Sequence, residues 1–430
     1  MSALHESALI SFFLSIVCIV GFALALGAIA QRLGQAPVIG EILAGILIGP
    51  SCLSAAVPEL HNLLATSGVK NGLYLLSQIG LVLLMFQFGL DFHLDHLRER
   101  KNRRAALSIA LGGLIAPFAL GALAGWYSHA LLAPAVPRAA YVLFCGIGLS
   151  ITAVPVLGRI ISDLGYQDTP AGSMAMSAAA LTDVIGWFML LAIVAIASAG
   201  FDPMQFAGKL ALFGAYCLVF SFVVKPLLLR ALAILDARGS ALAEQAKLAV
   251  TLCLVLVSAA ATSYIGVHTA FGGFMLGLLL SKQQKALGSW SISVPPLVNI
   301  LLVPVFFAYT GLNMDLSALF SGQMSLWTGV FIACAIVGKY GGSYVAARAS
   351  GLAIGDSRVI AMLMNTRGLM ELIVLNIGFS LGVIPASVFS MLVLMALVTT
   401  MLTSPMLHWW RTRMATQSPL LQDVATENGV

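Results

Sequence analysis

The sequence predicts an all-α polytopic membrane protein of about 13 transmembrane helices, built from two inverted repeats that contain two discontinuous, crossing helices. Three observations support this fold class: the composition, the alternation of charge between apolar runs, and a weak internal repeat. The 430 residues are 60% hydrophobic and only 9% charged, and the mean hydropathy is +0.99. Soluble domains are roughly 45–50% apolar, so a bilayer is the solvent that suits this chain.

Charge and cysteine usage narrow the class further. The net charge of +5 comes from basic residues that punctuate apolar runs, which indicates membrane topology and argues against a nucleic-acid-binding surface. Five of the six cysteines fall inside apolar segments, so no disulfide framework is predicted. No metal-ligand spacing, nucleophile elbow or phosphate loop stands out, and we therefore expect neither an enzyme nor a bound cofactor.

The apolar runs define the expected membrane spans. They cover residues 8–30, 38–50, 71–93, 105–127, 139–162, 171–199, 207–232, 246–263, 265–281, 293–311, 325–349, 358–380 and 385–408. With the N-terminus outside and the C-terminus in the cytoplasm, 17 of the 22 Lys and Arg residues lie on the inner side. Only Lys70, Arg138 and Lys209 lie outside, as expected because cytoplasmic loops collect basic residues.

Two stretches of the chain repeat each other weakly. Gly89-Leu90-Asp91 at the end of the third span resembles Gly311-Leu312-Asn313 at the end of the tenth, and 40–49 has an echo in 272–280. An offset of seven spans reverses the membrane orientation, so repeats at about 8–199 and 246–408 would be inverted, with 207–232 as a linker helix. We expect one transmembrane domain over 1–408 and a short cytoplasmic tail over 409–430. A chance likeness between Gly- and Leu-rich helices is the alternative.

The sixth span places one carboxylate in the middle of an apolar run. Asp183 lies in the sequence SAAALTDVIGW and directly follows Thr182. An ionised Asp at the centre of a membrane helix costs about 2.5–3.5 kcal/mol by insertion scales, and such residues usually serve function. The small residues at 177–180 would let another helix approach it closely.

Two spans carry signals of a broken helix. In the fifth, Pro155 removes a backbone donor after a glycine-containing stretch with Ser150 and Thr152, and the twelfth carries Asn365-Thr366-Arg367-Gly368 in an apolar run. Inverted repeats predict paired broken helices near the midplane, where freed carbonyls and hydroxyls can replace the water shell of a cation. A proline kink that serves packing alone is the alternative for the fifth span.

Further charges lie inside the predicted spans. Lys339 is about 15 Å from the inner end of its helix at 1.5 Å per residue, too deep for easy snorkelling. Arg367 and Glu371 are spaced i, i+4, which predicts a local ion pair with a mainly structural role.

Four motifs in this order resemble the monovalent cation:proton antiporter family 2, in the branch of the Kef and plant CHX transporters and related bacterial sodium/proton exchangers. They are 32–50, 151–159, the Asp183 helix and 364–376, and the resemblance covers about 8–408. It implies the NhaA-type fold, with a dimerisation domain, a mobile six-helix core and a homodimer in the lipid of a bacterial inner membrane. It also implies that Lys339 pairs with Asp183 when no cation is bound.

The resemblance implies a secondary active antiporter that exchanges Na⁺ or K⁺ for H⁺ by alternating access and serves pH homeostasis. The proton and the cation would compete for Asp183, with Thr182, Thr152 and Ser150 as oxygen donors and 365–367 with Glu371 in support. Thr182 stands where relatives carry Asp or Asn, which leaves one carboxylate and favours electroneutral exchange. Electrogenic exchange remains open if Lys339 sheds its proton when a cation displaces it from Asp183. Kef and CHX proteins continue into large cytoplasmic domains, and we expect no regulatory domain here. An uncoupled cation pathway and an organic-anion symporter on the same fold remain open.

Overall fold

The computed structural model describes residues 2–35, 37–49, 67–90, 100–163, 165–166, 169–198, 203–288, 290–314, 319 and 322–417. Within these ranges the chain is helical and contains no strand. The helices are α1 Ser2–Arg32, α2 Pro37–Ile48, α5 Ser67–Leu90, α6 Arg100–Leu132, α7 Arg138–Ser150, α8 Val154–Asp163, α9 Pro170–Ser198, α10 Pro203–Val219, α11 Lys225–Arg238, α12 Ala241–Tyr264, α13 Thr269–Leu280, α14 Trp290–Leu297, α15 Val303–Leu312, α16 Gly322–Ala349, α17 Ile354–Met364, α18 Leu369–Ser380 and α19 Ala386–Gln417.

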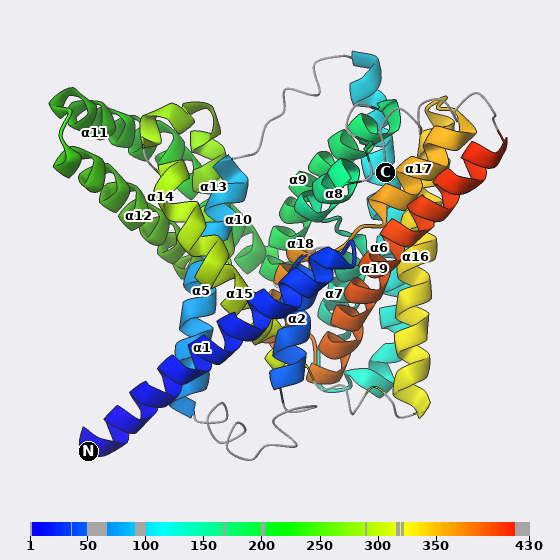
Figure 1. The fold of residues 1–430 in the computed structure, drawn as a ribbon, viewed down its shortest axis with the longest axis horizontal. Coiled ribbons are helices and arrows are strands. Elements are labelled where there is room, and N and C mark those ends of the chain that lie inside the picture. The colour runs from blue at the N-terminus through cyan, green and yellow to red at the C-terminus, as the bar shows by residue number, and fades with distance from the viewer. Residues whose placement is uncertain are drawn as a thin grey trace.

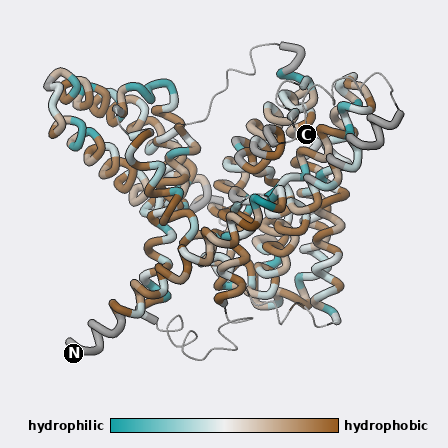
Figure 2. Tube along the Cα trace, in the orientation of Figure 1, coloured by the Kyte–Doolittle hydropathy of each residue, from teal (hydrophilic) through white to brown (hydrophobic). Residues whose placement is uncertain are grey.

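Every predicted span has a helical counterpart in the described ranges. Nine helical segments of the described part of the chain are long and apolar enough to cross a membrane, among them α10–α11 and α14–α15, each joined through a short π-helical turn. The other four spans are the short helices α2 and α13 and the discontinuous pairs α7–α8 and α17–α18. The last helix continues to Gln417, past the predicted boundary at 408. The hydropathy colouring in Figure 2 shows apolar segments along most of these helices.

The helices form two bundles, on the left and right of Figure 1. We call α1, α2, α5, α12, α13 and α14–α15 the scaffold bundle, and α6, α7, α8, α9, α16, α17, α18 and α19 the core bundle. The connector α10–α11 follows the first half of the chain and precedes α12. Each bundle takes helices from both halves of the sequence, because α5 packs on α13 and α6 packs on α16.

Close glycine contacts relate the two halves of the scaffold bundle. A Cβ on Gly40 would lie 2.2 Å from the Leu26 carbonyl oxygen, and a Cβ on Gly272 would lie 2.3 Å from that of Ser258. Both positions need glycine because the neighbouring backbone comes too close for a side chain. Two further pairs of close contacts correspond in the same way. The contact of Gly45 with the Ala308 backbone matches that of Gly277 with the Phe86 backbone. The contact of Gly89 with the Phe274 backbone matches that of Gly311 with the Ile42 backbone. The repeat detected in the sequence is therefore a repeat of helix contacts.

In the core bundle, α6 and α16 cross at very short range. A Cβ on Gly342 would lie 2.2 Å from the Gly112 carbonyl oxygen, and one on Gly338 would lie 2.6 Å from the Pro117 Cα. Small residues permit this approach in membrane helices, where apolar side chains gain little by leaving lipid. The crossing fixes α16 at the height of Lys339, which is fully buried.

Candidate ion site

The two predicted helix breaks exist, and they cross. α7 ends at Ser150 and α8 begins at Val154, while residues 365–368 separate α17 from α18. The Ala153 amide donates a hydrogen bond to the Thr366 carbonyl over 3.2 Å, which joins one break to the other. A Cβ on Gly368 would lie 3.0 Å from the Val156 Cγ2, so this crossing favours glycine.

Asp183 lies in the middle of α9, next to the first break. Its side chain is 8% exposed, and its Oδ1 has no hydrogen-bond partner among the residues that the structure describes. A Cβ on Gly186, one turn further along α9, would lie 3.3 Å from Ile151, so this face of α9 packs against the break. Among the residues described, no cationic side chain lies within 4.0 Å of the carboxylate. The site thus contains a buried carboxylate without an ion-pair partner.

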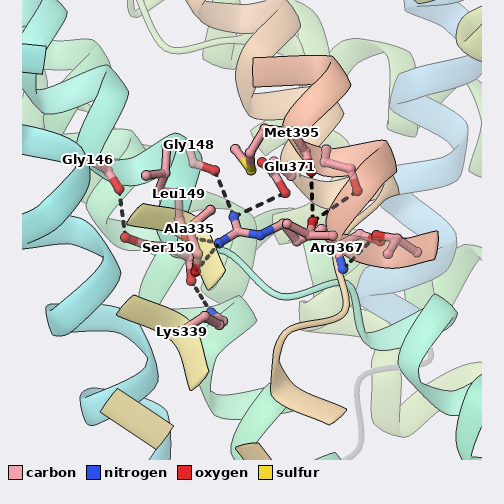
Figure 3. Close-up of polar contacts among 12 residues, drawn as sticks. Gly146, Gly148, Leu149, Ser150, Ala335, Lys339, Arg367, Glu371 and Met395 are labelled. Atoms are coloured by element: carbon pink, nitrogen blue, oxygen red, sulfur yellow. Dashed lines mark hydrogen bonds and ion pairs between the residues drawn. The ribbon is translucent and has the colours of Figure 1, made fainter. Parts of the chain in front are cut away.

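Two buried cations bind the carboxyl end of the half-helix α7 (Figure 3). Lys339 Nζ donates to the Ser150 carbonyl. Arg367 Nη1 donates to the Gly148 carbonyl at 3.3 Å, and its Nη2 donates to the Leu149 carbonyl at 2.6 Å. The last carbonyls of a helix lack intrahelical partners and carry partial negative charge, so both cations stabilise this end.

Lys339 therefore makes its direct contact with the backbone of α7, although its charge also acts on Asp183. The resemblance implied a pair between Lys339 and Asp183 in the empty site. In this structure the lysine has a partner that does not depend on the charge of the aspartate.

Arg367 and Glu371 form the predicted ion pair, with Nη1 and Oε2 3.4 Å apart. Both side chains are almost fully buried, and the Glu371 oxygens make no hydrogen bond within the described chain. Arg367 Nη2 also donates to the Ala335 carbonyl of α16 at 3.3 Å. The guanidinium consequently joins α18, α7 and α16 at one point.

Thr400 of α19 holds the backbone of Arg367, and sequence analysis did not single it out. Its Oγ1 accepts a hydrogen bond from the Arg367 amide at 3.0 Å and donates one to the Arg367 carbonyl at 2.6 Å. The only signal in the sequence was a pair of threonines, 399 and 400, in the apolar run of the last span.

The remaining predicted oxygen donors fall into two groups. The hydroxyls of Thr182 and Ser150 each donate to a carbonyl one turn earlier in their own helix, at 2.9 and 2.7 Å. The Thr366 hydroxyl, in the second break, donates to the Leu363 carbonyl of α17 at 2.6 Å. The Thr152 Oγ1 and the Asn365 Oδ1 are buried and have no hydrogen-bond partner in the described ranges. A buried polar atom without a partner is costly unless a water or ion occupies the place. Among the described residues of the crossing region, the Asp183 Oδ1 and these two oxygens lack both a hydrogen bond and an ion pair, whereas the Glu371 carboxylate is paired with Arg367.

Aromatic and polar contacts connect this region to the scaffold bundle. Trp187, one turn after Asp183, lies edge-on to Phe271 at 5.1 Å and stacks on Phe274 at 5.5 Å between ring centroids. On α18, the Asn376 Nδ2 donates to the Thr310 Oγ1 of α15 at 2.9 Å. The site therefore lies where the two bundles meet.

With the geometry established, the comparisons with known proteins decide the family. Residues 17–412 match the family model described as "Sodium/hydrogen exchanger, transmembrane". This chain belongs to the sodium/hydrogen exchanger family. It is 36% identical over 401 residues to the Na(+)/H(+) antiporter NhaS4 of Synechocystis, which covers 91% of this chain and 95% of that protein.

Other relatives of this exchanger are named for different cations. It is 28% identical to the Na(+)/H(+)-K(+) antiporter GerN of Bacillus cereus, over 93% of this chain and 96% of that one. It is 33% identical to the cation/H(+) antiporter 18 of Arabidopsis thaliana over 91% of its length, and it spans 48% of that longer protein.

The fold of the exchanger matches a solved structure. The sodium proton antiporter MjNhaP1 of Methanocaldococcus jannaschii superposes with a TM-score of 0.55, covering 95% of this chain and 99% of that one, at 14% identity. The family and the apolar helices establish an integral multi-pass membrane protein whose relatives are cation/proton antiporters.

Proposed function

We propose that this exchanger couples the movement of Na⁺ or K⁺ to the counter-movement of H⁺, and that Asp183 carries both ions in turn. The observation that supports this most is the buried Asp183 carboxylate, which has no cationic partner within the described chain. The relatives named as Na⁺/H⁺ and Na⁺/H⁺-K⁺ antiporters support the same reaction.

Coupling follows from the cost of an empty site. Burial disfavours the charged carboxylate, and either a proton or a dehydrated monovalent cation relieves that cost. One carboxylate cannot hold both, so the two ions compete. If only the neutralised forms pass between the two sides of the membrane, each cation that crosses is matched by protons that return.

We assign the cation ligands to the oxygens that lack partners. The Thr152 Oγ1 and the Asn365 Oδ1 supplement the Asp183 carboxylate, with Thr182, Ser150 and Thr366 as hydroxyls that retain free lone pairs. Oxygen ligands suit both Na⁺ and K⁺. Lys339, Arg367 and Glu371 hold the end of α7 in place and are positioning residues.

Alternating access requires the core bundle to move against the scaffold bundle. The contacts of Trp187 with Phe271 and Phe274, and of Asn376 with Thr310, join the two bundles, so we infer that they break and re-form during the cycle.

We place the protein in the bacterial inner membrane as a homodimer, with an external N-terminus and a cytoplasmic C-terminus. The 17 to 3 split of basic residues supports the orientation. Crosslinking in intact membranes tests the dimer. If the protein runs only at monomer mass after crosslinking, the dimer is refuted.

The function is tested in sealed proteoliposomes that contain a pH-sensitive dye. Addition of Na⁺ or K⁺ after an imposed pH gradient should move protons in the opposite direction, and Asp183→Asn should abolish this. Cation flux without proton movement would indicate an uncoupled pathway. Proton movement driven by an organic anion, with no response to Na⁺ or K⁺, would indicate a symporter. Either result would refute the proposed exchange.

A further inference from the structure

A cavity of about 410 Å³ lies in the scaffold bundle, away from the ion site. It is lined by the end of α5, the 3₁₀ turn Ser281–Leu287 and the start of α14, which lie in the left-hand bundle of Figure 1. The charge distribution assigns this end of the bundle to the cytoplasm, because Lys282 and Lys285 lie on the 3₁₀ turn. Its volume is within the usual range for small-molecule sites.

Two hydrogen-bond donors at this cavity have no partner. Trp290 lines it and is 2% exposed, yet its Nε1 makes no hydrogen bond within the described chain, and the same holds for the Gln87 Nε2. The indole nitrogen can only donate. Phe86 lies edge-on to Trp290 with ring centroids 5.1 Å apart, which fixes the indole plane. Both buried atoms therefore call for an acceptor from a bound molecule.

The charge around the cavity favours an anion. Lys285 lines its rim and is exposed, and no described Asp or Glu lines it. Glu244 approaches Gly288 from α12, where a Cβ would lie 2.7 Å from its Oε2, but Glu244 is paired with Lys247 at 2.5 Å. Two neutral donors and one ammonium group form a site that suits several acceptor oxygens on one negatively charged group.

We propose that this cavity binds a phosphate-bearing anion, with Trp290, Gln87 and Lys285 as donors to the phosphate oxygens. Two sources can supply that chemistry: the headgroup of an anionic phospholipid, or a soluble phosphate compound of the cytoplasm. The membrane is close, since Ile292 of α14 and Ile300 of the adjoining π turn are 77% and 58% exposed and apolar. The site is independent of Asp183, so binding and exchange can be tested apart.

Three single variants test the site. Trp290→Phe removes the indole donor and keeps a ring against Phe86, while Lys285→Gln removes the rim charge at an exposed position that folding does not depend on. Lys282→Gln is the matched control, because Lys282 is an exposed lysine of the same turn that does not line the cavity. Cation/proton exchange of each purified variant confirms its fold.

Binding is measured with two probes on protein in neutral phosphatidylcholine. One is dioleoylphosphatidylglycerol, counted as bound lipid by native mass spectrometry, and the other is inorganic pyrophosphate, measured by calorimetry. We expect the wild type and Lys282→Gln to bind at least one probe alike. Lys285→Gln and Trp290→Phe should each lose about tenfold in affinity, the equivalent of one charge-assisted contact.

The two probes distinguish the two sources of the phosphate. Binding of the lipid but not of pyrophosphate would identify a phospholipid headgroup as the ligand. Binding of pyrophosphate but not of the lipid would identify a soluble anion. Equal affinity of Lys285→Gln and Lys282→Gln would overturn the site, as would wild-type protein that binds neither probe. Normal exchange in all variants leaves the proposed function intact in either case.

Discussion

Replacement of Arg367 by methionine should destabilise the protein more than any other single change in the core bundle. The side chain is 0% exposed, and its guanidinium donates to three carbonyls, those of Gly148, Leu149 and Ala335. It is also the partner of Glu371, whose oxygens have no hydrogen bond within the described chain. Arg367→Met therefore leaves the Gly148 and Leu149 carbonyls at the end of α7 and one buried carboxylate unpaired, whereas the Ala335 carbonyl lies inside α16 and keeps its helical hydrogen bond.

The magnitude follows from those contacts. Breaking a buried ion pair by removing one partner typically costs about 3–5 kcal/mol, because the remaining charge is uncompensated. The unpaired carbonyls each add about 1 kcal/mol or more where water cannot reach them. With two such carbonyls at the end of α7, we expect Arg367→Met to lower the free energy of unfolding by about 5–7 kcal/mol. Adding Glu371→Gln should restore about 1–3 kcal/mol, since it removes the stranded charge.

The assay is a double-mutant cycle on protein in neutral lipid discs, with unfolding followed by thermal denaturation and by SDS titration. Glu371→Gln alone should cost less than Arg367→Met, because Arg367 keeps its carbonyl acceptors. Thr400→Val serves as a control that removes the backbone contacts and leaves the guanidinium in place. The reasoning fails if the double variant is less stable than Arg367→Met, since the two losses would then be independent.

Three further predictions concern transport and topology. Asp183→Asn should insert and purify normally yet lose coupled exchange, and wild-type rates in that variant would remove Asp183 from the mechanism. In a cysteine-free background, Ala135→Cys should react with an impermeant maleimide on intact cells and Ala237→Cys should not. The opposite labelling pattern would contradict an external N-terminus. Exchange in sealed vesicles should keep its initial rate when valinomycin and K⁺ impose a membrane potential, and a systematic change of rate with potential would contradict electroneutral transport.

The span pattern was predictable because it depends on local properties. Run length and flanking charge decide where a helix crosses a bilayer, and even the short helices α2 and α13 were required by the alternation of basic loops. The breaks were predictable for the same reason. Pro155 is the second residue of α8, where its missing amide costs nothing, and Gly368 directly precedes α18.

The partners of the buried charges were not predictable in this way. Arg367 binds the carbonyl of Leu149, 218 residues earlier in the chain, and Lys339 binds that of Ser150, 189 residues earlier. Every residue has a backbone carbonyl, so the sequence does not show which carbonyl accepts a hydrogen bond from a buried cation. Only a side-chain partner at i, i+4, such as Glu371 for Arg367, could be identified in advance. Thr400 was missed because a threonine inside an apolar helix usually bonds to its own backbone.

The contact between Lys339 and Ser150 bears on stoichiometry. If Lys339 released a proton whenever a cation reached Asp183, its ammonium would need Asp183 as its main partner in the empty site. The structure instead supplies a carbonyl at the end of α7, where the helix dipole favours a positive charge whatever Asp183 holds. Loss of the lysine proton would weaken that contact, because a neutral amine is a poorer donor than an ammonium group. The contact with Ser150 therefore favours a lysine that stays charged throughout the cycle. We therefore propose that Asp183 is the one group that changes protonation and that one cation exchanges for one proton.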